Sequence, residues 1–346
     1  MDPLSHVAFG RLLGALTGPQ VLRAGSPSSA PATGMPAAPD VETLTRRRAA
    51  RGLTAAYLLG SLSPDIDVVL MPHWDRYLVL HEYATHSFVG TVLPAVLTAL
   101  VILAVVRRRG ARFRHLFLGA WIGAVGHVVL DVASGGTSRW LWPLSDVRVT
   151  GALVAMADPI YAVPLGLFLI ASICWRRAAP RLARATLAIL LALSAVKAVS
   201  YIAALRTVAA HVDAGDGAVL EAHWGSFRDW RLFDRQGDDL RAWRIRAWPQ
   251  EAVLRFTKPV APTTPAIAAS KRLQSVQRFR ELFHLGFPTE TREDGWTTVL
   301  WSDIRFCGPA SCDLWFGGAL DPSLRPIEEI VLVGEWRQTR ARGLPD

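Results

Sequence analysis

Six long apolar segments dominate the first 210 residues of this chain, and few charges interrupt them. A helix that spans a bilayer needs about 20 apolar residues. The pattern therefore predicts a polytopic α-helical membrane bundle of about six helices, and a soluble bundle of buried helices is the alternative that it allows. The predicted spans cover residues 4–18, 53–70, 88–106, 116–132, 153–175 and 185–205.

Arginines cluster in alternate gaps between these segments, at residues 46–51, 107–114 and 176–184. The positive-inside rule assigns such clusters to the cytoplasm. Both chain ends, and everything after residue 205, would then lie outside it. This topology predicts a multi-pass membrane protein, which in a prokaryote would lie in the cytoplasmic (inner) membrane. Residues 19–50, which include a stretch rich in Pro, Ser and Ala, are expected to form a flexible cytoplasmic loop.

The net charge of +9 belongs to the apolar part of the chain, because residues 1–210 carry 20 Lys and Arg against 10 Asp and Glu. A basic surface that binds nucleic acid should lie on a folded polar domain, so this distribution excludes nucleic acid as the partner. From about residue 207 the sequence alternates as strands do. We predict a transmembrane metal-site domain over residues 1–206 and a C-terminal extracytoplasmic α+β domain over residues 207–346.

Histidines and aspartates occur at or near the outer ends of several of these segments, where ionisable side chains are costly to insert. Imidazole and carboxylate groups are also common ligands of transition metals. Their convergence on one side of the membrane predicts a metal centre there. Its candidate ligands are His6, Asp65, Asp67, His86, His127 and Asp131, with His81 as a further candidate.

Spacing supports two pairs within this set. His127 and Asp131 are four residues apart, so on a helix they share one face about one turn apart. Asp65 and Asp67 would point to one side if the chain after Pro64 is extended. Each pair alone has an ordinary explanation, as a helix-surface pair or a turn cap. Only the convergence of all of them favours a metal site.

Other polar residues have structural explanations beside functional ones. Lys197 either snorkels to the outer surface or offers its charge to an anionic substrate. Arg139 either binds a phosphate or carboxylate or lies among lipid headgroups. Asp158 precedes a proline and is expected to cap a helix. Cys307 and Cys312 can form a disulfide if the C-terminal domain is extracytoplasmic, and would be free thiols in the cytoplasm.

In the order of these motifs the chain resembles a family of inner-membrane-associated metal-dependent hydrolases, labelled LexA-binding or YdjM-type, in its longer form with a C-terminal domain. The chain departs from the family pattern at Val68 and at Glu82-Tyr83. The likeness covers residues 1–165, and WSDIRF (301–306) resembles the C-terminal domain of longer members. The resemblance over residues 1–165 rests on His6, SPDID (63–67), HEYATHS (81–87), GAVGHVVLD (123–131) and GGTSRWLWP (135–143).

The resemblance implies a site with one or two divalent metal ions, zinc first among them. One ion would be held by Asp65, His86, His127 and Asp131. The carboxylate of Asp131 would also bridge to a second ion bound by His6. Asp67 would accept a proton from water and would be catalytic together with Asp131.

The motif order is also similar to that of zinc-dependent phospholipase C and single-strand nucleases. The chain would then hydrolyse a phosphoester or similar bond of a membrane lipid or lipid-linked substrate at the outer face, with Arg139 and Lys197 binding the substrate. The alternative is a non-enzymatic membrane protein with a structural or transport metal site, or a regulatory component that binds a protein partner.

Overall fold

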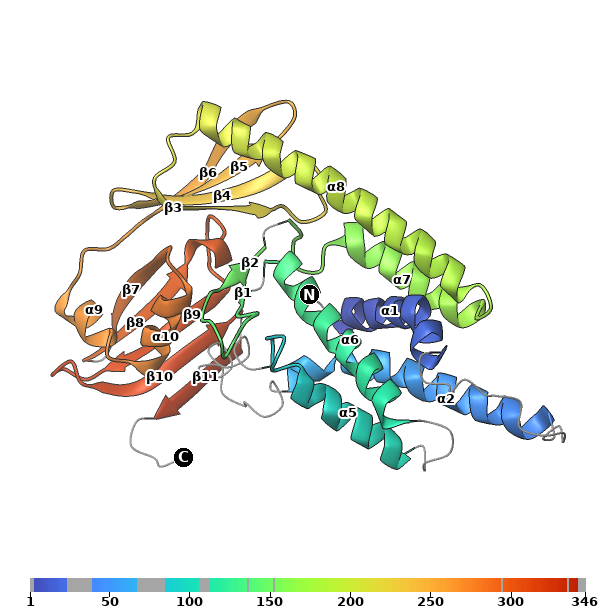
Figure 1. Cartoon of the computed structure of the whole chain (residues 1–346). Coiled ribbons are helices and arrows are strands. Elements are labelled where there is room, and N and C mark those ends of the chain that lie inside the picture. Colours follow the sequence, from blue (N-terminus) through green and yellow to red (C-terminus); the bar gives the residue numbers. More distant parts are fainter. Residues whose placement is uncertain are drawn as a thin grey trace. The chain divides into compact units, whose positions relative to one another are not determined.

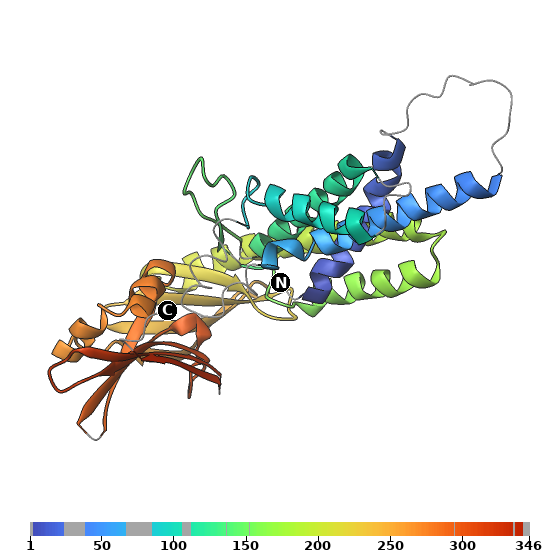
Figure 2. The same ribbon diagram turned by 90° about the horizontal axis from the view of Figure 1, so that it is seen from below.

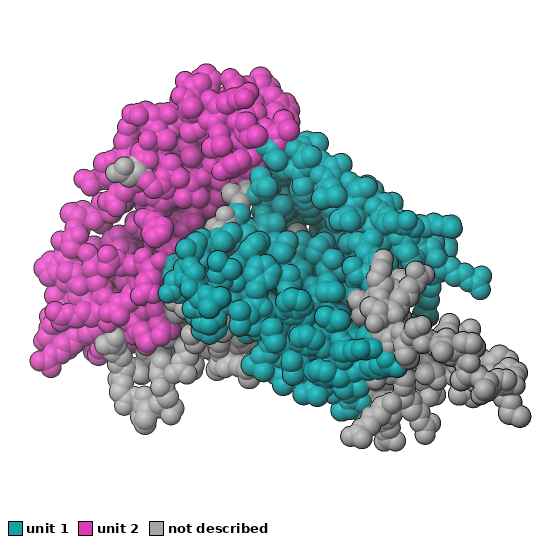
Figure 3. Space-filling model, viewed as in Figure 1, with its two compact units in different colours: residues 1–70, 80–198 teal, residues 71–79, 199–346 magenta. Residues whose placement is uncertain are grey.

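The computed structural model divides into two compact units, and the described residues up to Ala198 belong to unit 1 and those from Val199 on to unit 2 (Figure 3). The division falls inside helix α8 (Ala179–His211), upstream of the predicted boundary at residue 206. Unit 1 is mostly helical and unit 2 is mostly β-sheet (Figure 1). The structure describes residues 3–23, 39–66, 85–105, 112–135, 137–151, 153–293, 295–334 and 336–341.

Unit 1 is arranged around helix α6, which packs against α1, α2 and α5. Helix α7 packs on α1, and Figure 2 shows these two side by side. A short ribbon, β1 (Thr137–Ser138) and β2 (Val149–Thr150), follows α6. The helices are α1 (Pro3–Arg23), α2 (Pro39–Gly60), the short 3-10 helix η1 (Ser63–Asp65), α5 (Val92–Val105), α6 (Phe113–Ala133) and α7 (Pro159–Cys174).

The prediction of a bundle of about six membrane-spanning helices is wrong. Among the described residues, only α6 and α8 are long and apolar enough to cross a membrane. Helices α5 and α7 have 14 and 16 residues. At 1.5 Å per residue they are about 21 and 24 Å long, shorter than a hydrocarbon core of about 30 Å. The multi-pass arrangement with both termini outside the cytoplasm therefore loses its support.

The error has a physical cause, because an apolar run in the sequence does not mark where a helix begins and ends. Within the predicted span 53–70, helix α2 ends at Gly60 and the chain turns into η1, and residues 67–70 lie outside the described part. The N-terminal part of the span belongs to a helix that starts at Pro39 and carries the first arginine cluster. The predicted flexible loop over residues 19–50 is likewise helical up to Arg23, and residues 24–38 lie outside the described part.

Unit 2 contains two antiparallel sheets, and the predicted C-terminal domain is present as a β-sheet domain with short helices. The four-stranded sheet has the order β3-β4-β5-β6, and the five-stranded sheet has the order β11-β10-β9-β8-β7. Their strands are β3 (Asp216–Ala222), β4 (Asp229–Gln236), β5 (Asp239–Arg246), β6 (Glu251–Pro259), β7 (Gly286–Glu293), β8 (Trp296–Asp303), β9 (Leu314–Leu320), β10 (Pro326–Val333) and β11 (Trp336–Ala341).

Two short helices, α9 (Pro265–Ser270) and α10 (Gln274–Leu282), pack on the five-stranded sheet. Alternate residues of β8, Val299 and Trp301, join Phe279 of α10 in one apolar core. The indole of Trp301 also donates a hydrogen bond to the Ser270 hydroxyl at 3.0 Å. The alternation read from the sequence thus corresponds to one buried sheet face.

The buried carboxylate of Asp234 holds the C-terminal end of β4 in place. Asp234 is fully buried and accepts hydrogen bonds from the Arg241 guanidinium, from Trp243 Nε1 at 3.1 Å and from Gly215 N at 2.8 Å. Burial alone would raise the pKa of this carboxyl, but these donors hold the pKa below its ordinary value. The charged form of Asp234 is therefore the one that stabilises unit 2.

We expect Asp234→Ala to lower the free energy of unfolding of unit 2 by about 3 kcal/mol, because Arg241 and Trp243 lose a buried partner. Since the folded pKa of Asp234 is depressed, its contribution is present above its unfolded pKa and is lost as the pH falls through the folded one. Denaturant melts of the full-length chain against pH measure both effects. The matched control is Asp239→Ala at the exposed first residue of β5, and equal stability of the two variants would contradict the role given to Asp234.

Candidate metal centre

Four side chains from separate parts of unit 1 meet in one cluster. Asp65 ends η1, His86 precedes α5, and His127 and Asp131 lie one turn apart on α6. One potential ligand atom from each of them lies within 4.8 Å of the others. Residues up to 66 positions apart in sequence, from 65 to 131, are thus joined in space, as the sequence predicted.

The Nε2 atom of His127 lies nearest to the middle of this cluster. It is 2.9 Å from Asp131 Oδ2, 3.1 Å from Asp65 Oδ1 and 3.2 Å from His86 Nε2. The Nε2 atom of His86 lies 3.5 Å from each of the same two oxygens. Two imidazole nitrogens and two carboxylate oxygens therefore converge on one point, and this mixed donor set fits zinc and similar divalent ions.

Hydrogen bonds behind the imidazoles determine which nitrogen faces the cluster. His127 Nδ1 donates to the Ser61 carbonyl oxygen at 2.8 Å, which leaves Nε2 as an acceptor. His86 Nδ1 lies 3.0 Å from the Thr85 hydroxyl, and its own carbonyl accepts from Ser138 Oγ. Such partners on the far nitrogen are typical of metal-binding histidines, because they fix the tautomer and the ring orientation.

His6 of α1 joins the cluster from the other side of Asp131. Its Nε2 lies 3.2 Å from Asp131 Oδ1, and its ring stacks on that of His127 with centroids 3.8 Å apart. Its Nδ1 is buried without a hydrogen-bond partner among the described residues. One oxygen of Asp131 thus faces His127 and the other faces His6, which is the arrangement of a bridging carboxylate.

Close helix packing brings these elements together. A β-carbon on Gly60 would lie 2.2 Å from the Ala120 carbonyl oxygen, and one on Gly123 would lie 2.5 Å from the Tyr57 carbonyl oxygen. Only glycine permits helices α2 and α6 to approach this closely. The chain then leaves α2 at Gly60 and turns through η1, and Asp65 reaches α6.

The cluster is closed on its imidazole side and partly open on its carboxylate side. All three histidines are buried. By contrast, the side chains of Asp65 and Asp131 are 31% and 18% exposed. A ligand or water would therefore approach past the carboxylates.

The structure brings together five of the predicted ligands, His6, Asp65, His86, His127 and Asp131. Asp67 and His81 lie outside the described residues. Arg139, proposed to bind substrate, forms an ion pair with the exposed Asp146 at 2.7 Å. The carbonyl of Ser61 that orients His127 could not be found from the sequence, because any residue type supplies a carbonyl.

Lys197 and Asp158 form an ion pair that the sequence did not predict. Both side chains are fully buried, and Lys197 Nζ lies 3.6 Å from Asp158 Oδ2. Lys197 therefore does not snorkel to the surface. Asp158 also caps α7, as its place before Pro159 predicted, because its Oδ1 accepts from Ile160 N at 3.0 Å. In the sequence, Lys197 and Asp158 are each a lone charge within or beside an apolar segment, and the pair could have been inferred from this feature.

Comparison with known proteins identifies one related family. A family model described as YdjM inner membrane protein matches residues 1–204. This span contains all five clustered residues and ends before the first strand of unit 2. No curated protein and no solved structure matches the chain significantly.

Proposed function

Because the chain belongs to the YdjM inner membrane protein family, we propose that it is a membrane-embedded metal-dependent hydrolase. The observation that carries this proposal is the convergence of four ligand atoms within 4.8 Å in Asp65, His86, His127 and Asp131. Zinc is the proposed metal, because imidazole and carboxylate donors together suit it.

A divalent ion bound here would lower the pKa of a water molecule to about 7 and polarise a phosphoester bond. The protein's own groups have separate tasks. His127 offers a fixed Nε2 because the Ser61 carbonyl holds its other nitrogen. Asp131 can bind one ion and orient His6, or bridge two ions, since its oxygens face in different directions.

The proton that leaves water needs an acceptor on the open side of the cluster. Asp65 is its most exposed carboxylate and can take this proton. Asp67, two residues further along the chain, is the acceptor proposed from the sequence and is the alternative to Asp65. Either carboxylate would return the proton to the leaving group.

The proposed substrate is a lipid or lipid-linked phosphoester at the outer face of the membrane. Its support is that His127 and Asp131 lie near one end of α6, a helix long and apolar enough to cross a membrane. Arg139 is proposed to bind the phosphate. Lys197 is not proposed to bind the substrate, because the opposite charge of Asp158 already compensates its own.

A structural or transport metal site is the second candidate. It is favoured by one observation, namely that four protein donors are enough for a closed tetrahedral shell. Catalytic zinc sites instead keep one position open for water or substrate. Hydrolysis separates these two functions, whereas metal content does not.

We expect His127→Ala to lose bound metal and hydrolysis together, because this variant removes the nitrogen nearest to all other ligands. The measurements are metal content by mass spectrometry and turnover of a phosphodiester and of a phospholipid in mixed micelles. The matched control is His115→Ala on the same helix, which should keep both. Unchanged metal stoichiometry in His127→Ala would reject the ligand assignment, and metal loss without any wild-type turnover would favour the structural site.

We also propose that unit 2 lies outside the cytoplasm. Its support is the disulfide between Cys307 and Cys312, because protein disulfides persist in oxidising compartments and are rare in the cytosol. In protein purified without reductant, neither cysteine should react with a maleimide until a reductant is added. Cys174, which is free and exposed, serves as the internal control. Immediate labelling of all three thiols would contradict the extracytoplasmic location.

A further inference from the structure

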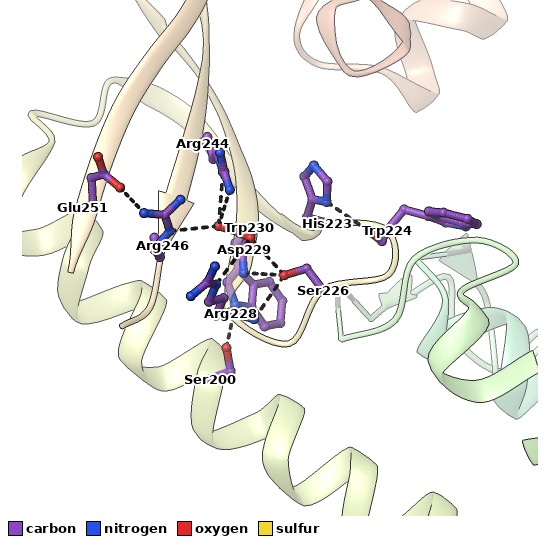
Figure 4. Close-up of polar contacts among 10 residues, drawn as sticks. All are labelled: Ser200, His223, Trp224, Ser226, Arg228, Asp229, Trp230, Arg244, Arg246 and Glu251. Carbon is purple, nitrogen blue, oxygen red and sulfur yellow. Dashed lines mark hydrogen bonds and ion pairs between the residues drawn. The ribbon is translucent and has the colours of Figure 1, made fainter. Parts of the chain in front are cut away.

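The four-stranded sheet of unit 2 is attached to the last turns of helix α8. Trp230, near the start of β4, donates from Nε1 to Ser200 Oγ at 2.9 Å (Figure 4). Its ring also packs on that of Tyr201. Asp234, further along β4, accepts instead from Gly215, beyond the end of α8. Strand β4 therefore runs in the same direction as the end of α8, and its first residues lie beside Ser200.

Helix α8 keeps exposed apolar side chains up to this point. It is one of the two described helices that can cross a membrane. Val199, Ile202 and Leu205 are exposed, and Arg206 then ends this apolar face. The start of β4, beside Ser200, therefore lies at the depth where a spanning helix passes from hydrocarbon to headgroups.

Two loops at this end of the sheet carry exposed tryptophans. Trp224, between β3 and β4, is 60% exposed, and Trp248, between β5 and β6, is also exposed. In Figure 4 the indole of Trp224 points away from the polar cluster around Asp229. Exposed tryptophan is costly in water but is the residue enriched at membrane–water interfaces.

Beside these tryptophans, three arginines share one carboxylate. Asp229 Oδ1 accepts from Arg244 Nε at 3.1 Å and from Arg246 Nε at 3.3 Å, and Arg228 Nε lies 4.0 Å from Oδ2. Among the described residues, only Arg246 of these three has a second acid, Glu251 at 2.6 Å. Three positive charges thus face two negative ones in this group, and the side chain of Arg228 is 54% exposed.

Hydrogen bonds hold this arrangement in place. The hydroxyl of Ser226 donates to Asp229 Oδ2 at 3.0 Å and accepts from the backbone N–H of Asp229. Burial alone would raise the pKa of Asp229, but the bonds from Ser226 and then from Arg246 and Arg244 hold it below its ordinary value. Asp229 therefore stays ionised and orients the guanidinium groups, whose planar donors match phosphate oxygens.

We propose that this end of the sheet, formed by Trp224, Arg228, Arg244 and Trp248, binds the phosphate groups of anionic phospholipids in the membrane that α8 enters. The tryptophans anchor the two loops among the headgroups, and the arginines bind the phosphates. Each arginine near an anionic leaflet contributes roughly fivefold to affinity. This binding is independent of the metal centre.

The test uses the full-length chain in nanodiscs of phosphatidylcholine with increasing phosphatidylglycerol, in a Cys174→Ser background. A nitroxide label is attached at Trp224→Cys or, as the matched control, at Trp296→Cys, an exposed tryptophan of the other sheet. Power-saturation spectroscopy then compares collisions of each label with oxygen and with a water-soluble nickel chelate. The label at position 224 should lose nickel collisions and gain oxygen collisions as phosphatidylglycerol rises, and the label at position 296 should not.

With Arg228→Gln, the label at position 224 should need roughly fivefold more phosphatidylglycerol for the same protection from nickel. Arg292→Gln, at an exposed arginine of the other sheet, should leave the titration unchanged. Equal nickel access at positions 224 and 296 in every lipid mixture would overturn the proposal. The proposal would also be overturned if inorganic phosphate, added to discs of phosphatidylcholine alone, protected the label at position 224 from nickel to the same degree. The ligand would then be a free anion.

Discussion

The candidate metal centre depends on the close packing of α6 against α2. At Gly60 and Gly123 the two backbones approach so closely that a β-carbon at either position would collide with a backbone carbonyl. This approach lets the Ser61 carbonyl reach His127 Nδ1 at 2.8 Å. If the helices were further apart, the imidazole would lose its orienting partner, and Asp65 would move away from α6.

The sequence predicted more of the site than of the fold around it. His127 and Asp131 could be paired from their spacing alone, because helix geometry fixes which residues share a face. Asp65, His86 and His6 could only be assigned by position and chemistry, since each belongs to another element. One Asp131 oxygen faces His127 and the other faces His6, and this could be seen only once the helices are packed in the structure. The pairing of Lys197 with Asp158 also depends on how α7 and α8 fold back.

The six-helix prediction was wrong because hydropathy describes composition and not the bounds of helices. The segment around Pro159–Cys174 is apolar throughout but forms only 16 helical residues. The sixth predicted span ends at residue 205, yet Ser200 and Thr207 of the same helix already bond to the sheet of unit 2. The strands were easier to predict, because burial of one sheet face imposes alternation on most of a segment such as β8.

The central claim is that imidazole and carboxylate groups hold a divalent metal ion in a membrane protein. X-ray absorption at the zinc edge of the purified, metal-loaded chain tests it most directly, because this spectrum reports the atoms bound to the metal. A metal ion held by these groups should show a shell of nitrogen and oxygen at about 2.0–2.2 Å, with scattering from at least two imidazole rings. A sulfur shell at about 2.3 Å, or a shell without imidazole, would contradict it.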